Sequence, residues 1–442
     1  MSSGVRAGVF SLALALLSPA VFPSPRHAAA QQPAVATGFT RASPEDVGMD
    51  GAALARLGET LDRYVEAGRL SGGVLLIARS GRIVWHDAFG MRDREASAPM
   101  TPDVIFRIAS QTKALVSVAV MMLQEEGALL ISDDVGKYIP EFAHTTVAMT
   151  RAGGGYDIVD ATRPITIRDL LTHTAGIGYG NGAARDLWRE AGIQGWYFGH
   201  LDEPIGTTVA RMAALPFDAQ PGSAYVYGYS TDILGALIER VSGMPLDDFL
   251  RTRIFDPLGM RDTQFYLDPS ERHRLAAVYS VTEAGALVRA PEGAGMEAQG
   301  QYVDGPRRSL SGGAGLLSTA DDYGRFLQML LNGGELEGAQ LLSPKTVELM
   351  TVNHVGDLYP WQAGAGFGLG FEVVTDLGAR GEPGSIGEYG WGGAYHSSYW
   401  VDPVEDLVVV YFTQVVPATG LDDFGKVRAG IYAAIERSLG NR

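Results

Sequence analysis

The stretch GVLLIARSGRIVWHDAF, residues 73–89, is typical of two β-strands joined by a tight turn at Ser80-Gly81. Both flanking runs are rich in β-branched and aromatic residues, which is the pattern of a hairpin. Two similar runs, residues 397–401 and 407–412, lie near the other end of the chain with the turn DPVED between them. Two-stranded pieces are only marginally stable alone, so we expect the two ends to pair into one antiparallel sheet.

Helix signals occupy most of the chain beside and between these strands. The expected helices, each with an apolar stripe or a start or stop signal, are residues 51–67, 109–126, 231–241, 320–331 and 422–438. The residues expected to cap helices are Thr166, Ser230 and Thr319. One further strand is expected at residues 367–374.

The predicted fold is therefore α/β of the α+β kind. An antiparallel sheet formed by both chain ends is flanked by helices, and a mainly helical domain is inserted into it. The expected sheet domain comprises residues 45–115 and 305–442, and the expected helical domain comprises residues 116–304.

The composition narrows the classes of function. The chain has 442 residues, a hydrophobic fraction of 46% and a formal net charge of −16. This apolar content suits one large core, and the acidic balance disfavours nucleic acid as a partner. Because the chain has no cysteine, disulfides, thiolate metal sites and a cysteine nucleophile are excluded. No histidine pattern typical of a zinc site occurs, and we expect neither a metal nor another cofactor.

The first thirty residues have the order of an export signal. Arg6 precedes an apolar run, residues 7–17, and Ala28-Ala29-Ala30 offers a small-residue cleavage site. Residues 1–30 are therefore predicted to be a signal peptide, and the mature protein is expected to be periplasmic or secreted. No later stretch reaches the roughly 18 apolar residues of a membrane-spanning helix, so no stable membrane insertion is expected after signal removal.

A serine and a lysine stand one helical turn apart in Ser110-Gln111-Thr112-Lys113. Side chains three residues apart lie on one face of a helix, so the hydroxyl and the amine could share a proton. The residues that follow, 114–123, are almost all apolar, and their helix is expected to be buried. Burial favours the uncharged form of an amine, which acts as a base, and a helix N-terminus favours a developing alkoxide.

This pair is a weak signal by itself. With four lysines in the chain, a serine three residues before one of them arises by chance in roughly a quarter of such sequences. The context strengthens the signal. Nearly all basic residues of the chain are arginine, which does not deprotonate, yet the residue at this position is a lysine, which can act as a base. On local evidence, a catalytic pair and an accidental pair both stay open.

Further stretches extend the pattern along the chain. They are residues 106–113 (FRIASQTK), 165–176 (ITIRDLLTHTAG), 221–235, 241–243 (VSG), 254–260 (IFDPLGM), 312–319 (GGAGLLST), 391–393 (WGG) and 400–403 (WVDP). Together, and in this order, they resemble the serine β-lactamase and penicillin-binding-protein superfamily, above all its class C branch and the related family VIII carboxylesterases. The resemblance covers nearly all of the chain after the signal, and it implies an acyl-enzyme on Ser110.

The resemblance assigns roles to residues that are far from Ser110 in the sequence. The tyrosine that matches the family's Tyr-x-Asn motif is Tyr227, which would share the Ser110 proton with Lys113 and deliver it to the leaving group. Tyr229 stands where the motif has asparagine, so it is expected at the substrate and an amide is missing there. Without the resemblance, Tyr225, Tyr227 and Tyr229 are more simply interpreted as an alternating packing run.

The third motif implied by the resemblance is Trp391-Gly392-Gly393, in place of the Lys-Thr-Gly of β-lactamases. All three residues are expected at the substrate, and the backbone N–H groups of Ser110 and Ala394 would form the oxyanion hole. Because Trp391 replaces a lysine, a cation that could bind a substrate carboxylate is lost and an aromatic wall takes its place.

Two residues after this motif are further candidates for substrate binding. Tyr395 could line the acyl pocket, although aromatic residues near strands more often belong to the core. His396 could return some positive charge to the site, although a structural role is the more frequent one.

These observations predict a serine hydrolase that acts through an acyl-enzyme on Ser110, with small neutral carboxylic esters as substrates and partners. The alternatives within the enzymes are a β-lactamase and a D-aminoacyl peptidase, since one acyl-transfer chemistry serves all three. The alternative from another class is a penicillin-fold protein that binds a ligand without turnover. The oligomeric state stays open.

Overall fold

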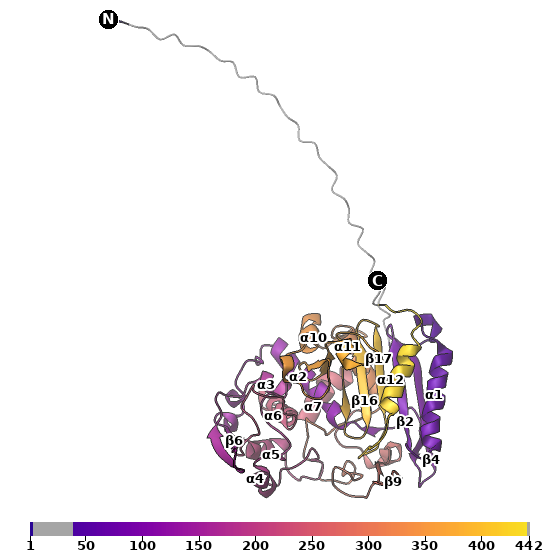
Figure 1. Cartoon of the computed structure of the whole chain (residues 1–442), viewed down its shortest axis with the longest axis horizontal. Helices are drawn as coiled ribbons and strands as arrows, with labels where there is room; N and C mark the ends of the chain where they lie inside the picture. Colours follow the sequence, from indigo (N-terminus) through magenta and orange to yellow (C-terminus); the bar gives the residue numbers. More distant parts are fainter. Residues whose placement is uncertain (3–38, 440–442) are drawn as a thin grey trace. The chain divides into compact units, whose positions relative to one another are not determined.

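The computed structural model describes residues 1–2 and 39–439. The predicted signal peptide lies outside the described residues, apart from its first two. The described residues 39–439 form one compact unit, in which helices cover both faces of a large sheet (Figure 1). The domain boundaries drawn from the sequence stay a prediction. Within the described part of the chain, no helix has the length and apolar character needed to cross a membrane.

The central sheet of the described chain has nine strands. In spatial order they are β1 (Thr40–Arg41), β3 (Arg82–Asp93), β2 (Gly72–Arg79), β17 (Leu407–Phe412), β16 (Ser397–Asp402), β15 (Tyr389–Gly393), β14 (Glu372–Val374) and β13 (Ala365–Phe367), with β4 (Ala98–Pro99) paired to β3. β1 is parallel to β3, and the other pairs are antiparallel. Val74 of β2 pairs with Phe412 of β17, so the two chain ends build one sheet, as the sequence predicts.

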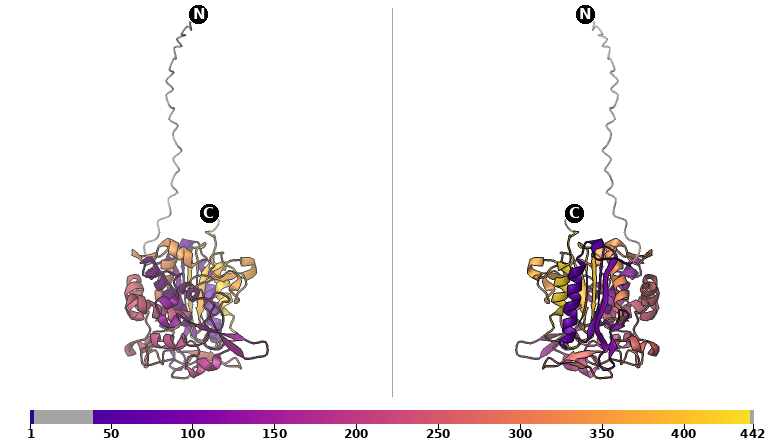
Figure 2. Two further views of the ribbon diagram at one scale, coloured as in Figure 1. Left: turned by 90° about the vertical axis from the view of Figure 1, so that its left-hand side faces the viewer. Right: turned by 90° about the vertical axis from the view of Figure 1, so that its right-hand side faces the viewer.

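The central strands are apolar on both faces because both faces are covered. Leu75 and Ile77 of β2 pack toward the helices α1 (Gly51–Glu66) and α12 (Asp423–Ala433). Val74 and Leu76 point the opposite way, toward α2 (Thr112–Glu125) and α9 (Ala320–Leu331). Successive side chains along each strand point to opposite faces and therefore belong to two separate hydrophobic cores. Figure 2 shows α1 lying across the sheet.

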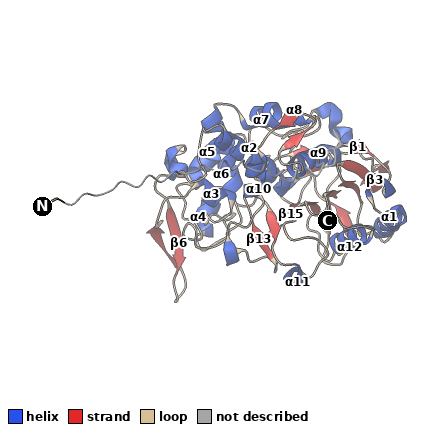
Figure 3. Cartoon of the chain, turned by 90° about the horizontal axis from the view of Figure 1, so that it is seen from above, coloured by secondary structure: helices blue, strands red, loops and turns tan. Residues whose placement is uncertain are grey.

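Most of the remaining elements lie in the sequence between β5 (Phe106–Arg107) and β10 (Leu317–Ser318). The helices are α3 (Ile167–Leu171), α4 (Arg185–Glu190), α5 (Ile205–Met212), α6 (Ser230–Ser242), α7 (Leu246–Leu250), α8 (Asp256–Leu258), α10 (Pro344–Met350) and α11 (Leu377–Arg380). The strands outside the central sheet are β5 (Phe106–Arg107) with β10 (Leu317–Ser318), β6 (Thr146–Thr150) with β7 (Tyr156–Asp160), β8 (Tyr279–Val281) with β9 (Leu287–Arg289), and β11 (Glu335–Leu336) with β12 (Ala339–Gln340). Seen from above, α3 to α6 gather away from α1 and α12 (Figure 3).

Two helix caps expected from the sequence are confirmed. Thr166 and Asp169 form a capping box at the start of α3. The Thr319 side chain accepts the N–H of Asp322 at the start of α9. Ser230, in contrast, is not a cap: α6 begins at Ser230 itself, and its hydroxyl has no hydrogen-bond partner among the described residues.

Residues 367–374 are not one strand, contrary to the sequence prediction. The chain turns back after β13, where the N–H of Gly368 donates to the Phe371 carbonyl (2.7 Å), and it returns as β14. Gly370 has φ +100° and a Cβ there would lie 2.4 Å from Ser117 Oγ of α2. Only glycine suits this turn, because it combines a left-handed backbone with close contact to α2. The last predicted helix is also shorter than expected, since α12 ends at Ala433.

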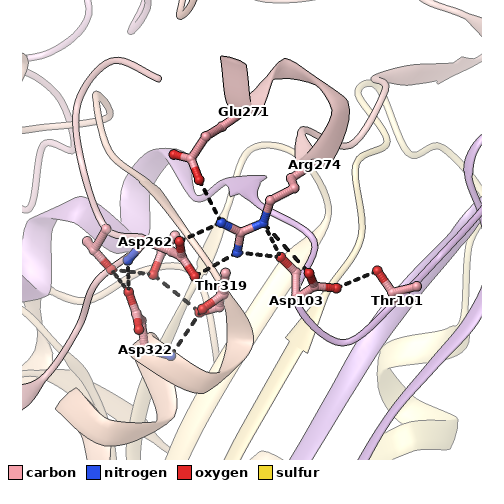
Figure 4. A network of polar contacts seen from close by, with 9 residues as sticks. Thr101, Asp103, Asp262, Glu271, Arg274, Thr319 and Asp322 are labelled. Atoms are coloured by element: carbon pink, nitrogen blue, oxygen red, sulfur yellow. Dashed lines mark hydrogen bonds and ion pairs between the residues drawn. The ribbon is translucent and has the colours of Figure 1, made fainter. Parts of the chain in front are cut away.

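The segment that leads to Ser110 is fixed from two sides. The N–H of Ile105 donates to the Arg274 carbonyl (3.0 Å), and β5 pairs with β10. The Arg274 guanidinium donates to both carboxylate oxygens of Asp262 (2.7 Å each), to Glu271 (2.9 Å) and to the Asp103 carbonyl (2.9 Å), as Figure 4 shows for this network. These contacts tie residues 262–274 to the chain just before Ser110.

Candidate active site

Ser110 lies in a tight turn directly before a buried helix. Residues 109–111 form one turn of 3-10 helix, and α2 begins at Thr112, so the predicted single helix consists of two parts. Ala109 has φ +43°, a conformation that residues other than glycine adopt rarely. The turn is held from outside, because Gln111 Nε2 donates to Ser397 Oγ of β16 (3.0 Å) and the Tyr323 hydroxyl donates to the Gln111 carbonyl (2.9 Å).

Lys113 is buried and has three oxygen partners. Its Nζ lies 3.3 Å from Ser110 Oγ, 3.2 Å from the Tyr179 hydroxyl and 2.7 Å from the Gly313 carbonyl oxygen. A protonated amine donates to all three oxygens. A neutral amine has two N–H groups and one lone pair, so it can donate to two of them and accept the Ser110 proton. The same geometry therefore serves both before and after proton transfer.

The Gly313 carbonyl is placed by a buried carboxylate on α6. Asp232 Oδ1 accepts the Ser311 hydroxyl (2.6 Å) and the Gly313 N–H (3.1 Å). A Cβ at Gly313 would lie 2.5 Å from Asp232 Oδ2, so only glycine allows this approach. Burial raises the pKa of the Asp232 carboxyl, while Ser311 and Lys113 oppose that rise.

Tyr227 meets Lys113 with its ring rather than with its hydroxyl. Lys113 Nζ lies 4.6 Å from the centre of the Tyr227 ring, and the Tyr227 hydroxyl accepts a hydrogen bond from Trp391 Nε1 (3.0 Å). The structure thus brings Ser110, Lys113, Tyr227 and Trp391 together, as the sequence predicts for one site. The phenol oxygen that accepts a hydrogen bond from Lys113 Nζ is that of Tyr179 (3.2 Å), where we expected Tyr227 to share a proton with the lysine.

Tyr179 is a site residue that the sequence analysis missed. Burial, followed by the neighbouring Tyr227, raises the pKa of the Tyr179 phenol well above its usual value, so this hydroxyl keeps its proton. Tyr179 and Tyr227 lie next to each other because the segments that carry them approach closely at Gly228. A Cβ at Gly228 would lie 2.3 Å from the Ile177 carbonyl oxygen, so only glycine allows this approach. The sequence offered one signal for Tyr179, namely that it lies three residues after Gly176, the end of a stretch that matches the family.

His173 lies behind Tyr227 and packs against its ring. Its ring centre is 4.6 Å from that of Tyr227, and its Nδ1 has no hydrogen-bond partner among the described residues. Burial, assisted by the nearby Lys113, lowers the pKa of His173 well below its usual value. A neutral imidazole here adds no second positive charge next to the lysine.

The predicted oxyanion donors are brought together by a glycine on β15. A Cβ at Gly393 would lie 2.6 Å from the Ile108 carbonyl oxygen, so the strand can approach the Ser110 turn this closely only without a side chain. Ala394 follows directly, and Ser110 and Ala394 both line one cavity of about 580 Å³. The two residues whose N–H groups the resemblance assigns to the oxyanion hole therefore line the same cavity.

Three residues expected at the substrate lie elsewhere. Tyr229 is fully buried, and its hydroxyl donates to the Gly195 carbonyl (2.8 Å). Tyr395 is fully buried in a small cluster that includes Ala109. His396 turns away to bond Asp423 through Nε2 (2.8 Å) and to stack on Phe424. None of the three lines the cavity, because each finds its partners in the core or on α12.

Comparison with known proteins identifies the family. The beta-lactamase family model matches residues 57–432. The chain belongs to the beta-lactamase family. It is 34% identical to esterase EstB of Burkholderia gladioli over 389 residues, which cover 84% of this chain and 93% of that protein. It is 28% identical over 396 residues to a putative D-alanyl-D-alanine carboxypeptidase of Salmonella typhimurium, with coverage of 84% and 85%.

A solved structure agrees with this membership. EstCE1, described as a hydrolase with promiscuous acyltransferase activity, superposes with a TM-score of 0.73 at 30% identity and covers 86% of this chain and 99% of its own. Together with the family model and the esterase relative, it shows that this chain is a serine hydrolase of the beta-lactamase family.

The cavity of this family member has an aromatic mouth. Trp361 is 53% exposed and stacks on Trp391 at 5.6 Å between ring centres, with Tyr227 at 5.0 Å and Tyr359 at 6.1 Å. All four line the cavity together with Ser110. Trp361 was not predicted from the sequence, because it lies in a loop with no motif around it.

Proposed function

We propose that this protein hydrolyses neutral carboxylic esters through an acyl-enzyme on Ser110. The observation that carries the proposal is the buried Lys113 amine, which joins Ser110 Oγ and the Tyr179 hydroxyl within 3.3 Å. The 34% identity to an esterase supports the substrate class.

The proposed reaction has two halves. Ser110 Oγ attacks the ester carbonyl while its proton passes to Lys113 Nζ, and the N–H groups of Ser110 and Ala394 stabilise the oxyanion. The proton then reaches the departing alkoxide through the two phenols, Tyr179 and Tyr227, and the alcohol leaves. A water molecule then attacks the acyl-enzyme and gives one proton to Lys113 Nζ. The amine passes this proton to Ser110 Oγ as the bond between Oγ and the acyl carbon breaks, which releases the carboxylic acid and restores both Ser110 and the neutral amine.

The walls of the cavity favour a neutral substrate over a carboxylate-bearing lactam. Trp391 occupies the position where the family's β-lactamases place a lysine. The arginines among the described lining residues, Arg380 and Arg428, are already bound to Glu372 and Glu388 (2.6 Å each). No unpaired cation is therefore offered to a substrate carboxylate by the described lining.

Two measurements test the proposal. A fluorophosphonate probe should label Ser110, as mapped by mass spectrometry, and Ser110→Ala should abolish both the adduct and hydrolysis of p-nitrophenyl butyrate. The absence of an adduct would favour a binding protein without turnover. The wild type should hydrolyse p-nitrophenyl butyrate faster than nitrocefin or a D-alanyl-D-alanine peptide, and the opposite order would favour a β-lactamase or a peptidase.

We also propose that the protein acts outside the cytoplasm, supported by the signal-like order of residues 1–30. Expression of the full chain in a bacterial host, followed by fractionation and N-terminal sequencing, should give a periplasmic or secreted protein cleaved near Ala30. An uncleaved cytoplasmic protein would contradict this.

A further inference from the structure

The cavity at Ser110 continues past the edge of the sheet. β14 pairs with β15 at two positions, Val373 with Tyr389 and Glu372 with Gly390, so the later residues of β15 extend beyond it. Trp391 packs against the core on the α2 side, whereas Trp400 packs in the core on the side of α1 and α12. The same cavity is lined by both tryptophans, and it therefore reaches both faces of the sheet.

We call the part of this cavity lined by Arg380, Glu382, Trp400, Phe424 and Arg428 the far arm. Glycines leave it open. Gly390 and Gly392 of β15 and Gly425 of α12 line the cavity without side chains. A Cβ at Gly425 would meet nothing within 4 Å, so a side chain there would project into free space.

The charges of the far arm are nearly balanced. Arg380 is bound to Glu372 and Arg428 to Glu388, each at 2.6 Å. Glu382 lies between the two guanidinium groups, 3.4 Å from Arg380 Nε and 3.7 Å from Arg428 Nε. The net charge of this group is about −1, which disfavours an additional anion, and each carboxylate already has an arginine partner, so none is left unpaired for an additional cation. The far arm is therefore suited to an uncharged group.

Hydrogen-bonding capacity in the far arm is unused in both directions. Trp400 is 6% exposed, and its Nε1 makes no hydrogen bond with the described residues. Arg380 Nε is likewise buried and makes no hydrogen bond with them, although Glu382 lies 3.4 Å away as an ion-pair partner. Glu382, whose side chain is 43% exposed, accepts no hydrogen bond from the described residues. Buried polar groups normally have partners, so two donors and one acceptor here await a ligand that can both accept and donate. A hydroxyl group does both.

We propose that the far arm binds a polyhydroxylated group, a sugar or a similar polyol, in the alcohol half of the ester. A polyol carries hydroxyls, so it enters an ester as the alcohol component. Its hydroxyls would meet Glu382, Arg380 Nε and Trp400 Nε1, and its C–H faces would lie against the rings of Trp400 and Phe424. This inference rests on the proposed esterase function, because it names the alcohol that the site accepts.

The test compares two acetates with six-membered rings of similar size and with similar leaving groups. Methyl 6-O-acetyl-glucopyranoside carries the hydroxyls, and cyclohexylmethyl acetate has the same six-membered ring without them. Because both release a primary alcohol, the wild type should show a kcat/KM higher by about tenfold or more for the sugar ester, as expected when a site hydrogen bonds substrate hydroxyls.

Three variants and one control test whether the preference for the sugar ester arises in the far arm. Gly425→Leu fills the far arm from an open helix position, and the matched control Gly206→Leu places the same side chain at an open position on α5 that lines a different cavity. The first should bring the kcat/KM ratio of the two esters close to one, and the control should leave the ratio unchanged. Glu382→Ala removes the acceptor and Trp400→Phe removes the Nε1 donor while keeping a ring; each should lower the ratio several-fold.

A binding measurement distinguishes a failure of the far-arm proposal from a failure of the proposed esterase function. Calorimetry with Ser110→Ala should detect the sugar acetate, and the double variant Ser110→Ala/Gly425→Leu should not bind it. Hydrolysis of both esters at equal rates, or a ratio unaffected by Gly425→Leu, overturns the far-arm proposal and leaves the esterase standing. If the wild type hydrolyses neither ester while Ser110→Ala still binds the sugar acetate, the esterase function fails and the polyol site stands.

Discussion

The substitution Tyr179→Phe is the sharpest test of how the lysine is supported. It removes one oxygen, 3.2 Å from Lys113 Nζ, and leaves the ring in place. A hydrogen bond to a charged group contributes about 1.5–3 kcal/mol. At about 1.4 kcal/mol for each factor of ten in rate, kcat/KM should fall about 10- to 150-fold. Initial rates with p-nitrophenyl butyrate measure the fall, and a rapid-mix burst assay shows whether acylation is the slowed step.

The control is Tyr229→Phe, which removes a buried phenol hydroxyl without touching the lysine. That hydroxyl donates to the Gly195 carbonyl at 2.8 Å and to the backbone carbonyl of Tyr179 at 3.3 Å, so its removal leaves the Tyr179 hydroxyl and the hydrogen bond from Lys113 in place. Its loss should lower the free energy of unfolding by about 1 kcal/mol and leave kcat unchanged. If Tyr179→Phe keeps most of the activity, or if both variants lose activity equally, the assignment of Tyr179 to the proton path is wrong.

Three further outcomes follow from the geometry. Lys113→Arg should lower kcat by about 10²–10⁴-fold, because a guanidinium keeps charge but does not accept the serine proton; stopped-flow acylation rates check this. Gly393→Ala should lower kcat by up to about 10²–10³-fold with the fold intact by circular dichroism, because its Cβ would lie 2.6 Å from the Ile108 carbonyl and displace an oxyanion donor. Burial raises the pKa of the Asp322 carboxyl to about 6. The folded state then binds this proton more tightly than the unfolded state, so stability should fall by up to about 3 kcal/mol as pH rises from about 4 to 6. Asp322→Asn should flatten that fall in urea titrations, and an unchanged slope would contradict the cause.

The site was predictable where its residues are near each other in sequence or carry a motif. Ser110 and Lys113 are three residues apart, so helix geometry alone places them together. Tyr227 and Trp391 could be predicted as site residues only through the family resemblance. Tyr229 was misassigned because the motif aligns its position but not its direction: its ring turns into the core, where its hydroxyl bonds to the Gly195 carbonyl.

By itself the sequence determined the sheet, because the apolar strand pairs at the two chain ends are only marginally stable alone and are stabilised by pairing with each other. It also determined the serine–lysine pair, because that contact spans one helical turn. Tertiary structure decided which phenol reaches the lysine and what surrounds the substrate. Tyr179 and Tyr227 meet because glycine at position 228 lets two loops approach closely. The far arm combines side chains from α11, the loop after it, β16 and α12. Such contacts depend on packing between segments distant in the chain, which no local pattern of residues encodes.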